Sequence, residues 1–539
     1  MLFGGSTETT LRQSKFVIVG AGAAGSAAAK CFAAANCAGQ TIWFEQHSEM
    51  GGSAGYFSRG QPRRTFDAGA TQLIECASGA LQERLYSLAP AKDQAPAEQI
   101  FQKIDSITQH WPALARRVVL HADGNVVWNA ERPPTPSEQN DIDRLKKFLG
   151  TCAKEADWMW KLLADIPRFP PQNFRDVLRA LKLFLQVPLR KKITFPYLFL
   201  ASARHMMRRH GIAKEGLADD VIRGLLVDTT QSTPEHSPWL AAAMGISILS
   251  RGIYRCRKGM RAYFRPLLSS FEEHQGSYLP HHQLVRIETH SDGFLLSCRN
   301  THSGDVIQYL ATESLMLNLT LWDLCGSLFP ENDPVRRTRI FQTWKKKSAH
   351  ERGWGAWAVY ALVEDKPEWD DGPLFHQIFP SPTEHPLLQS SLYVSIPARD
   401  DPAHPAGQRV LTATLHVEAR DYSSEERNLF TAQLVARIEE ALRSKLSHVE
   451  SALPATFAKY TGRAHGQVGG FPLTHRNFMF GAPPAQLVHP INKRTKLLLM
   501  GDTVFPGQGV VACSVSGIVA FERATNLTFA SLAAKHFRT

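Results

Sequence analysis

A glycine-rich turn between two short apolar segments constrains the fold of this chain most strongly. Residues 16–19 form an apolar run rich in β-branched side chains, of the length of a buried strand. The pattern Gly-x-Gly-x-x-Gly follows at 20–25, and an alanine-rich stretch after it predicts a helix. A second apolar run, 41–44, ends on Glu45, about twenty residues after the last glycine. This is the element order of a dinucleotide-binding unit.

Each part of this unit has a physical role toward a pyrophosphate. Gly20 allows a tight turn, Gly22 lets the backbone approach the phosphates, and Gly25 lets the helix lie close to the strands. The N-terminus of the helix supplies free N–H groups and the positive end of its dipole. Glu45 is expected to accept hydrogen bonds from ribose hydroxyls. The segment therefore predicts a Rossmann-like domain.

Two further glycine-rich segments extend this prediction. Gly51 and Gly52 lie shortly after the acid and predict backbone packed against a second part of a large cofactor, which favours FAD over NAD. Near the C-terminal end, a leucine-rich run ends at Gly501 and Asp502, and Gly509 precedes a helix of small residues. The N-terminus of that helix can face an anionic or electron-rich group. We predict that both corners contact the same flavin.

Length and composition limit the number of domains and the kinds of partner and compartment that we expect for this chain. A chain of 539 residues exceeds a single ordinary core, so we expect two domains or a large insertion. The formal net charge is +11, but no nucleic-acid-binding motif accompanies it, and no nucleic-acid partner is predicted. Eight scattered cysteines without a CxxC pair predict reduced thiols and no metal site. The polar N-terminus and the lack of long apolar runs predict neither export nor a spanning helix.

The segment 168–209 concentrates much of the positive charge. It carries ten basic residues and one acid, Asp176, with apolar and aromatic side chains between them. Such a stretch can lie in a membrane interface while its basic side chains reach phosphate head groups. The alternative is a solvated helix face over the core. The first interpretation predicts a cytoplasmic protein, peripheral on the inner face of an anionic membrane.

Motifs spread over nearly the whole chain carry a family resemblance. They are 20–25 with Glu45, 51–56, 66–71, 318–323, 394–402 and 501–510. The last, Gly-Asp followed by Phe-Pro-Gly-Gln-Gly, is the most specific. With these motifs the chain resembles the carotenoid desaturase and isomerase family of FAD-dependent flavoproteins, and most of all the carotenoid cis-trans isomerases. It departs from many desaturases at Ser53, where they carry arginine.

The patterns and the resemblance together predict an α/β fold. A discontinuous, Rossmann-like FAD-binding domain would comprise 1–90, 251–325 and 466–539. A mixed α+β substrate domain, associated with the membrane, would comprise 91–250 and 326–465.

The resemblance also implies which residues contact FAD. Val285 would touch the adenine through its backbone, and Asp502 would bond near the ribityl–phosphate junction. The full predicted set is Gly20, Gly22, Ala24, Gly25, Glu45, Gly51, Gly52, Ser53, Thr71, Val285, Gly501, Asp502, Gly509 and Val510. No catalytic residue is assigned. The histidine candidates are His205, His236, His376, His465 and His475, although a single histidine is more often structural.

The function that these features favour is an FAD-dependent oxidoreductase acting on a carotenoid or related polyisoprenoid, by desaturation or by cis-trans isomerisation. The substrate would be a long apolar polyene or lipid, and the electron acceptor stays open. Three alternatives remain: a retinol-saturase-like or other lipid-acting flavoprotein, a flavin amine oxidase, and a non-catalytic lipid-binding protein on the same fold.

Overall fold

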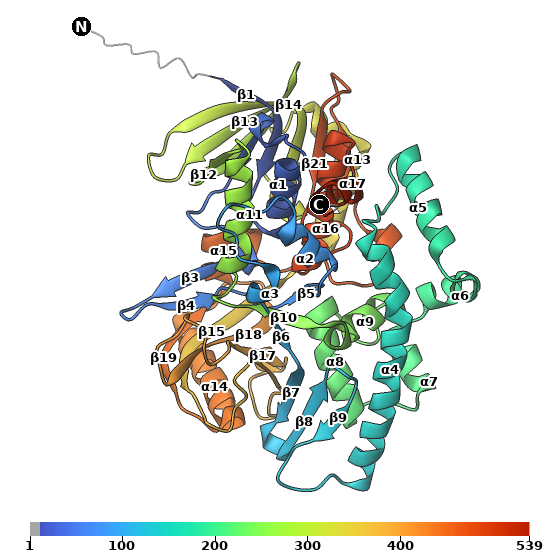
Figure 1. The fold of residues 1–539 in the computed structure, drawn as a ribbon, viewed down its shortest axis with the longest axis vertical. Coiled ribbons are helices and arrows are strands. Elements are labelled where there is room, and N and C mark those ends of the chain that lie inside the picture. The colour runs from blue at the N-terminus through green and yellow to red at the C-terminus, as the bar shows by residue number, and fades with distance from the viewer. Residues whose placement is uncertain (1–10, 538–539) are drawn as a thin grey trace.

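The structure, a computed structural model, describes residues 11–537 and contains two large sheets with a layer of helices beside them (Figure 1). The expectation about the polar N-terminus falls largely outside these residues. The first sheet has eight strands, and β11, β2, β1, β14 and β21 run parallel in that order. Its strands are β1 (Arg12–Val19), β2 (Thr41–Phe44), β11 (Ser277–Leu279), β12 (His282–His290), β13 (Gly293–Asn300), β14 (Val306–Leu317), β20 (Gln486–Val488) and β21 (Lys496–Leu499).

Both faces of this sheet are buried, as its apolar strands predict. Phe16 and Ile18 of β1 face one core, and Val17 and Val19 face the other. The first core is closed by α1 (Ala23–Ala34), α2 (Leu81–Ser87), α11 (Arg261–Glu273), α16 (Val510–Thr525) and α17 (Phe529–His536). The second is closed by α12 (Leu321–Cys325) and α13 (Arg339–His350). Helix α13 thus packs with the first sheet, although it follows the boundary predicted at 325 between the FAD-binding and substrate domains. The domain boundaries stay predictions.

The second sheet lies below the first in Figure 1 and comes from distant parts of the chain. Its strands are β7 (Ser106–Trp111), β8 (Arg116–His121), β9 (Val126–Trp128), β15 (Trp354–Glu364), β16 (Leu374–Ile378), β17 (Leu392–Ile396), β18 (Gln408–Glu418) and β19 (Leu446–Ala452). Helix α14 (Ser424–Leu442) covers one face. Smaller pairings join β3 (Tyr56–Arg59) to β4 (Arg64–Asp67), and β10 (Ile253–Cys256) to β5 (Leu73–Ile74) and β6 (Phe101–Ile104).

The remaining helices form the layer at the right of Figure 1. The longest, α4, begins with a capping box in which Thr135 and Glu138 each satisfy the other's backbone N–H. The layer comprises α4 (Pro136–Ala164), α5 (Phe174–Gln186), α6 (Leu189–Leu200), α7 (Ala203–Arg209), α8 (Leu217–Thr230), α9 (Trp239–Ile246) and α10 (Ile248–Arg251); α3 (Ala97–Ile100) and α15 (Pro454–Thr461) lie outside it. Helices α5 and α6 stand at its outer edge.

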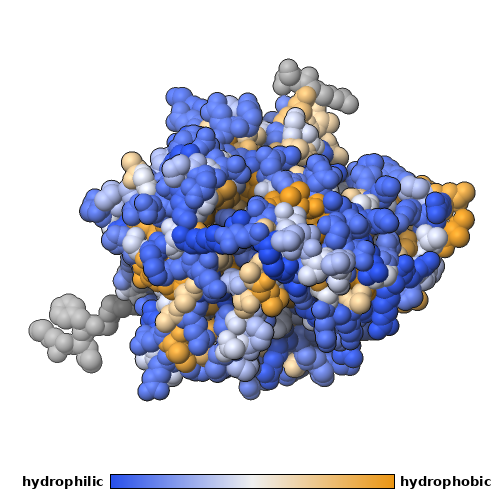
Figure 2. All heavy atoms as spheres, turned by 90° about the horizontal axis from the view of Figure 1, so that it is seen from below, coloured by the Kyte–Doolittle hydropathy of each residue, from blue (hydrophilic) through white to orange (hydrophobic). Residues whose placement is uncertain are grey.

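Large hydrophobic side chains are concentrated on the outside of α5 and α6. Figure 2, a view from below, shows a hydrophobic patch at the right-hand edge, the side on which these helices lie in Figure 1. The exposed residues of this patch are Phe174, Val177, Leu178, Leu181, Phe184, Leu185, Leu189, Ile193, Tyr197 and Leu200. Among residues 11–537 no single helix has the length and apolar character to cross a bilayer; α16 and α17 reach it only jointly, across a bend of 96°.

Candidate functional site

The two glycine corners meet at one edge of the first sheet. The strand register aligns the ends of four parallel strands, pairing Val19 with Phe44 and with Leu317, and Leu317 with Leu499. Because parallel strands present their carboxyl ends at the same edge, Glu45, Gly20 and the 500–502 segment emerge side by side.

Asn318, which follows β14, lies between the two corners. Its N–H donates to the Val19 carbonyl over 2.9 Å. A Cβ atom on Gly20 would lie 2.9 Å from the Asn318 carbonyl oxygen, and one on Gly501 would lie 3.0 Å from its Oδ1. Both glycines have positive φ, so side chains there would meet strain as well as contact. Asn318 belongs to the motif 318–323, but it is not among the site residues predicted from the sequence.

A cavity of about 1150 Å³ extends from both corners into the helical layer. Ten predicted residues line it: Gly20, Gly22, Glu45, Gly51, Gly52, Ser53, Thr71, Asp502, Gly509 and Val510. The other four lie behind the surface. Gly25 packs on Gly20, where a Cβ would come within 2.0 Å of the carbonyl oxygen, and Ala24 packs on Gly517. Gly501 donates its N–H to Ser516. Val285 lies one residue past the lining residues 282–284, at an irregularity of β12.

The lining at the corners suits a large anionic dinucleotide. Gly22 is the N-cap of α1 and Gly509 is the N-cap of α16, so neither N-terminus has a side-chain cap. Their free N–H groups therefore face the cavity at two points. The hydroxyl of Ser53, which also lines the cavity, is buried and has no hydrogen-bond partner among the described residues. Uncapped helices and an orphaned buried hydroxyl fit a bound polar cofactor.

Glu45 is already oriented by the backbone. Its Oε2 accepts a hydrogen bond from the Ala21 N–H over 2.6 Å, and its Oε1 accepts one from the His47 N–H over 3.0 Å. Burial raises the pKa of this carboxyl, and the two N–H groups oppose that shift. Each oxygen keeps a second lone pair for a ribose hydroxyl.

Asp502 has a partner that the sequence did not indicate. Nη2 of Arg463 lies 2.6 Å from its Oδ2, and both residues line the cavity. Arg463 follows α15 and lies in none of the motifs named from the sequence, so only the tertiary structure brings it to the second corner.

Beyond the corners the cavity becomes mainly apolar. Its walls come from α4, α5, α6, α9 and the segment 478–480. Val177, Leu181 and Phe184 of α5 line the cavity and are also among the exposed hydrophobic residues. The cavity therefore reaches the exposed face of α5.

The five histidines considered from the sequence lie elsewhere. Among the described residues the histidines that line the cavity are His47, His282 and His416. Gln231, Tyr393 and Asp228 lie in the wall with His416. Burial lowers the pKa of His416 to about 4 and raises that of Asp228 to about 7. No motif pointed to this polar group, since its members come from the C-terminal end of α8 and from β17 and β18.

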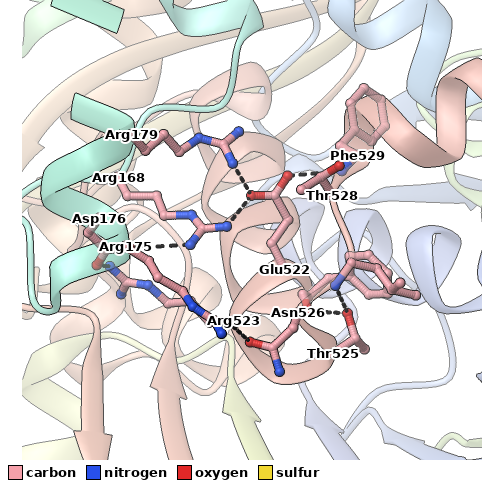
Figure 3. Close-up of polar contacts among 12 residues, drawn as sticks. Arg168, Arg175, Asp176, Arg179, Glu522, Arg523, Thr525, Asn526, Thr528 and Phe529 are labelled. Atoms are coloured by element: carbon pink, nitrogen blue, oxygen red, sulfur yellow. Dashed lines mark hydrogen bonds and ion pairs between the residues drawn. The ribbon is translucent and has the colours of Figure 1, made fainter. Parts of the chain in front are cut away.

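In the basic segment 168–209 some basic side chains form internal ion pairs and hydrogen bonds, whereas others remain exposed. Asp176 and Glu522 are fully buried and bind two arginines of the segment, Arg168 and Arg179; Asp176 also binds Arg523 of α16 (Figure 3). Nη1 and Nη2 of Arg168 lie 3.2 Å from Asp176 and 2.7 Å from Glu522, and Nη1 of Arg179 lies 3.1 Å from Glu522. Arg175 donates to Asn526 over 2.9 Å. These side chains attach α5 to α16 rather than facing a membrane.

Other basic side chains of the segment are also engaged. Lys191 pairs with Glu155, and Arg204 pairs with buried Asp219. Lys182 and Arg190 remain exposed beside the hydrophobic patch. Neither the membrane interpretation nor the solvated-face alternative describes the whole segment, because part of its charge serves internal packing.

Comparisons with known proteins agree with this geometry. The family model described as an NAD(P)-binding Rossmann-like domain matches residues 18–87. The chloroplastic prolycopene isomerase of Daucus carota is 22% identical over 95% of this chain and 80% of its own length. The Arabidopsis thaliana prolycopene isomerase is 21% identical over 94% of this chain and 82% of its own length. The resemblance predicted from the motifs is confirmed.

Solved structures show the same fold. A putrescine oxidase variant matches with a TM-score of 0.60 at 15% identity, over 96% of this chain and 99% of that one. A fatty acid isomerase from P. acnes that produces CLA matches with a TM-score of 0.55 at 14% identity, over 94% and 97% of the two chains. The predicted α/β class with a Rossmann-like domain is confirmed. The prediction of an enzyme of the oxidoreductase and isomerase class is confirmed by the curated relatives.

Proposed function

We propose that this chain is an FAD-dependent enzyme that isomerises a carotenoid or a related polyene lipid. The observation that carries the proposal is one cavity that joins two glycine corners to an apolar chamber. The corners suit the two ends of a large dinucleotide, and the chamber suits a long hydrocarbon. Similarity to prolycopene isomerases over nearly the whole chain supports both the substrate class and isomerisation.

The residues at the corners would hold FAD in an extended form. The N-terminus of α1 at Gly22 would receive the pyrophosphate, Glu45 the ribose, and Asp502 the ribityl region. The N-terminus of α16 at Val510 would face the carbonyl end of the flavin ring. A bound flavin supplies an electron-rich or hydride-accepting ring. The chain itself binds and orients the polyene and keeps water out with the apolar walls of α4 and α9.

The alternatives differ in what they require of the cavity. A desaturase would use the same chamber but needs an electron acceptor, which isomerisation does not. An amine oxidase has the same fold, yet apolar walls extending to exposed α5 favour a lipid over a soluble amine. A lipid carrier without activity would have no need of uncapped helix N-termini facing the chamber.

We also propose that the patch of α5 and α6 rests on an anionic membrane and that the polyene enters there. The ten exposed hydrophobic side chains lie beside Lys182 and Arg190, which suits an interface of acyl chains and phosphates. The side chains shared by the patch and the cavity support the entry route. The protein would then be peripheral on the membrane.

Pigment analysis tests the activity. The chain is produced in cells that accumulate prolycopene, and the pigments are separated by chromatography; we expect all-trans product and purified yellow protein with a flavin spectrum. Formation of more desaturated pigments would show that the enzyme is a desaturase and not an isomerase. Colourless protein that takes up no FAD, or unchanged pigments beside a flavin bleached by amines, would overturn the proposal.

A further inference from the structure

One carboxyl group of the cavity differs from the others in having no partner. Within the described residues five acids line the cavity: Glu45, Glu49, Asp228, Asp323 and Asp502. Four of them are held in place. Glu45 accepts two backbone N–H groups, Glu49 accepts the Tyr56 hydroxyl, Asp323 accepts the Ala464 N–H, and Asp502 pairs with Arg463. Among residues 11–537 no ion pair or hydrogen bond reaches the Asp228 carboxyl.

Asp228 lies beside the second glycine corner. It is in the last turn of α8, and the carbonyl of the next residue, Thr229, accepts a hydrogen bond from the Gln508 side chain over 3.3 Å. Gln508 immediately precedes Gly509, the N-cap of α16. The Thr230 carbonyl accepts the Leu473 N–H over 2.9 Å. The end of α8 is therefore fixed to the loops that carry the second corner.

The groups around Asp228 leave it free to hold a proton. The Tyr393 hydroxyl donates to the Gly224 carbonyl over 2.8 Å, so its own proton is engaged. His416 and Gln231 contact each other, yet His416 Nδ1 and Gln231 Oε1 are buried without partners. Burial keeps His416 neutral and raises the pKa of Asp228 to about 7, because an ionised carboxylate is poorly solvated in this chamber. A poised carboxyl without a structural partner is typical of acid–base catalysis.

We propose that Asp228 is the catalytic acid–base that protonates one carbon of the reacting polyene double bond and then removes a proton from that carbon. This inference rests on the proposed function. The Asp228 O–H bond breaks as a C–H bond forms, and the π bond becomes an allylic cation delocalised over the polyene. Rotation about the former double bond follows. Loss of a proton from the same carbon to the Asp228 carboxylate restores the double bond and the acid, with no net oxidation or reduction.

The geometry of one carboxyl makes a stereochemical prediction. The proton arrives and leaves on the same face of the polyene, because one fixed side chain handles both steps. In this proposal the protonated carbon is the end that turns, so rotation that converts cis into trans moves the newly added proton away from that face and brings the original vinylic hydrogen toward it. In heavy water the product should therefore carry one deuterium at each isomerised double bond.

The test uses the FAD-loaded protein, prolycopene in detergent micelles, and the variant Asp228→Asn. We expect turnover to fall by at least about 100-fold in Asp228→Asn, with unchanged flavin content. Asp228→Glu should recover part of the loss. Asp220→Asn is the matched control, since Asp220 is on the same helix, pairs with Arg116 and lies outside the cavity. It should leave turnover within about threefold.

A readout apart from activity is the infrared carbonyl band of a protonated carboxyl. This band should titrate near pH 7 in the wild-type protein, and Asp228→Asn should lack it. Product without deuterium, turnover of Asp228→Asn within about threefold of wild type, or an unchanged infrared band would each overturn the role of Asp228 while leaving isomerisation in place. A wild-type protein that binds FAD but converts no polyene would overturn the proposed function and this role with it.

Discussion

Oδ2 of Asp176 in the first turn of α5 lies 2.8 Å from Nη2 of Arg523 in the last turns of α16, and both side chains are buried (Figure 3). Helix α16 begins at the second glycine corner, and α5 carries part of the exposed hydrophobic patch. The ion pair therefore joins the proposed flavin-facing helix to the proposed membrane-facing helix. Arg168 strengthens the link because it contacts both Asp176 and Glu522.

Replacing Asp176 by alanine should loosen α5. The change leaves the Arg523 guanidinium buried without that carboxylate, at a cost on the order of 3–5 kcal/mol. We expect faster amide hydrogen exchange across residues 174–186, with the first sheet still protected. Lys182→Gln is the control, because Lys182 lies on the same helix and is exposed; its effect should stay below about 0.5 kcal/mol. Equal exchange in the two variants would contradict the anchoring role.

Reversing two exposed charges should weaken membrane binding. Lys182→Glu with Arg190→Glu leaves the internal ion pairs intact, whereas Lys191 is engaged by Glu155. Each basic residue near an anionic surface contributes about 1 kcal/mol, so binding to phosphatidylserine vesicles should fall by at least about 30-fold. The control variant, Lys345→Glu with Lys346→Glu on α13, carries the same charge change away from the patch and should bind as wild type. Sedimentation with vesicles measures both, and equal binding by all three proteins would remove the membrane proposal.

Replacing Gly22 by valine should prevent binding of the cofactor without unfolding the chain. Gly22 has φ −73° and ψ −176°, which valine can adopt; its Cβ would lie 2.8 Å from Nδ2 of the Asn318 side chain and 3.9 Å from the Gly51 carbonyl oxygen. The isopropyl group would occupy the approach to the uncapped helix N-terminus. We expect FAD occupancy at least about tenfold lower, a loss of about 1.4 kcal/mol in binding, with an unchanged circular dichroism spectrum. Gly150→Ala, where nothing lies within 4 Å of the added Cβ, should keep full FAD content. Normal flavin content in Gly22→Val would contradict the assignment of this corner.

Stability should depend on pH through Asp228. Its pKa is about 7 in the fold against 3.8 for the unfolded side chain, so between these values the native state keeps a proton that the unfolded state has lost. Stability conferred by this group is therefore largest at acidic pH and is lost as the pH rises toward 7 and above. Tyr393 and His416, which line the same wall, do not change charge between pH 5 and pH 8.

Thermal unfolding of the loaded protein and of Asp228→Asn measures this effect. The melting temperature of wild type minus that of the variant should be higher at pH 5 than at pH 8. The same difference at both pH values would show that the carboxyl does not titrate between them.

Local sequence was sufficient for the two glycine corners, because each combines a buried strand, a turn that needs glycine and a helix within about 30 residues. The spacing predicted Gly20, Gly22 and Glu45, and the structure places them on one cavity with Gly509. The corners meet because β1 and β21 both pair in parallel with β14. The apolar patterns of these strands are compatible with that pairing but do not specify it.

The amino-acid sequence by itself thus determined the nucleotide-binding unit and the α/β class, since these depend on short-range patterns. Only the tertiary structure decided which charges are available to a partner. Asp176 stood as one acid among ten basic residues, yet it is buried against Arg523, which is more than 300 positions away. Asp228 stood in no motif and became a candidate acid because folding left it unpartnered in an apolar chamber. Burial and pairing set the pKa and accessibility of a side chain, and both depend on contacts between distant parts of the chain.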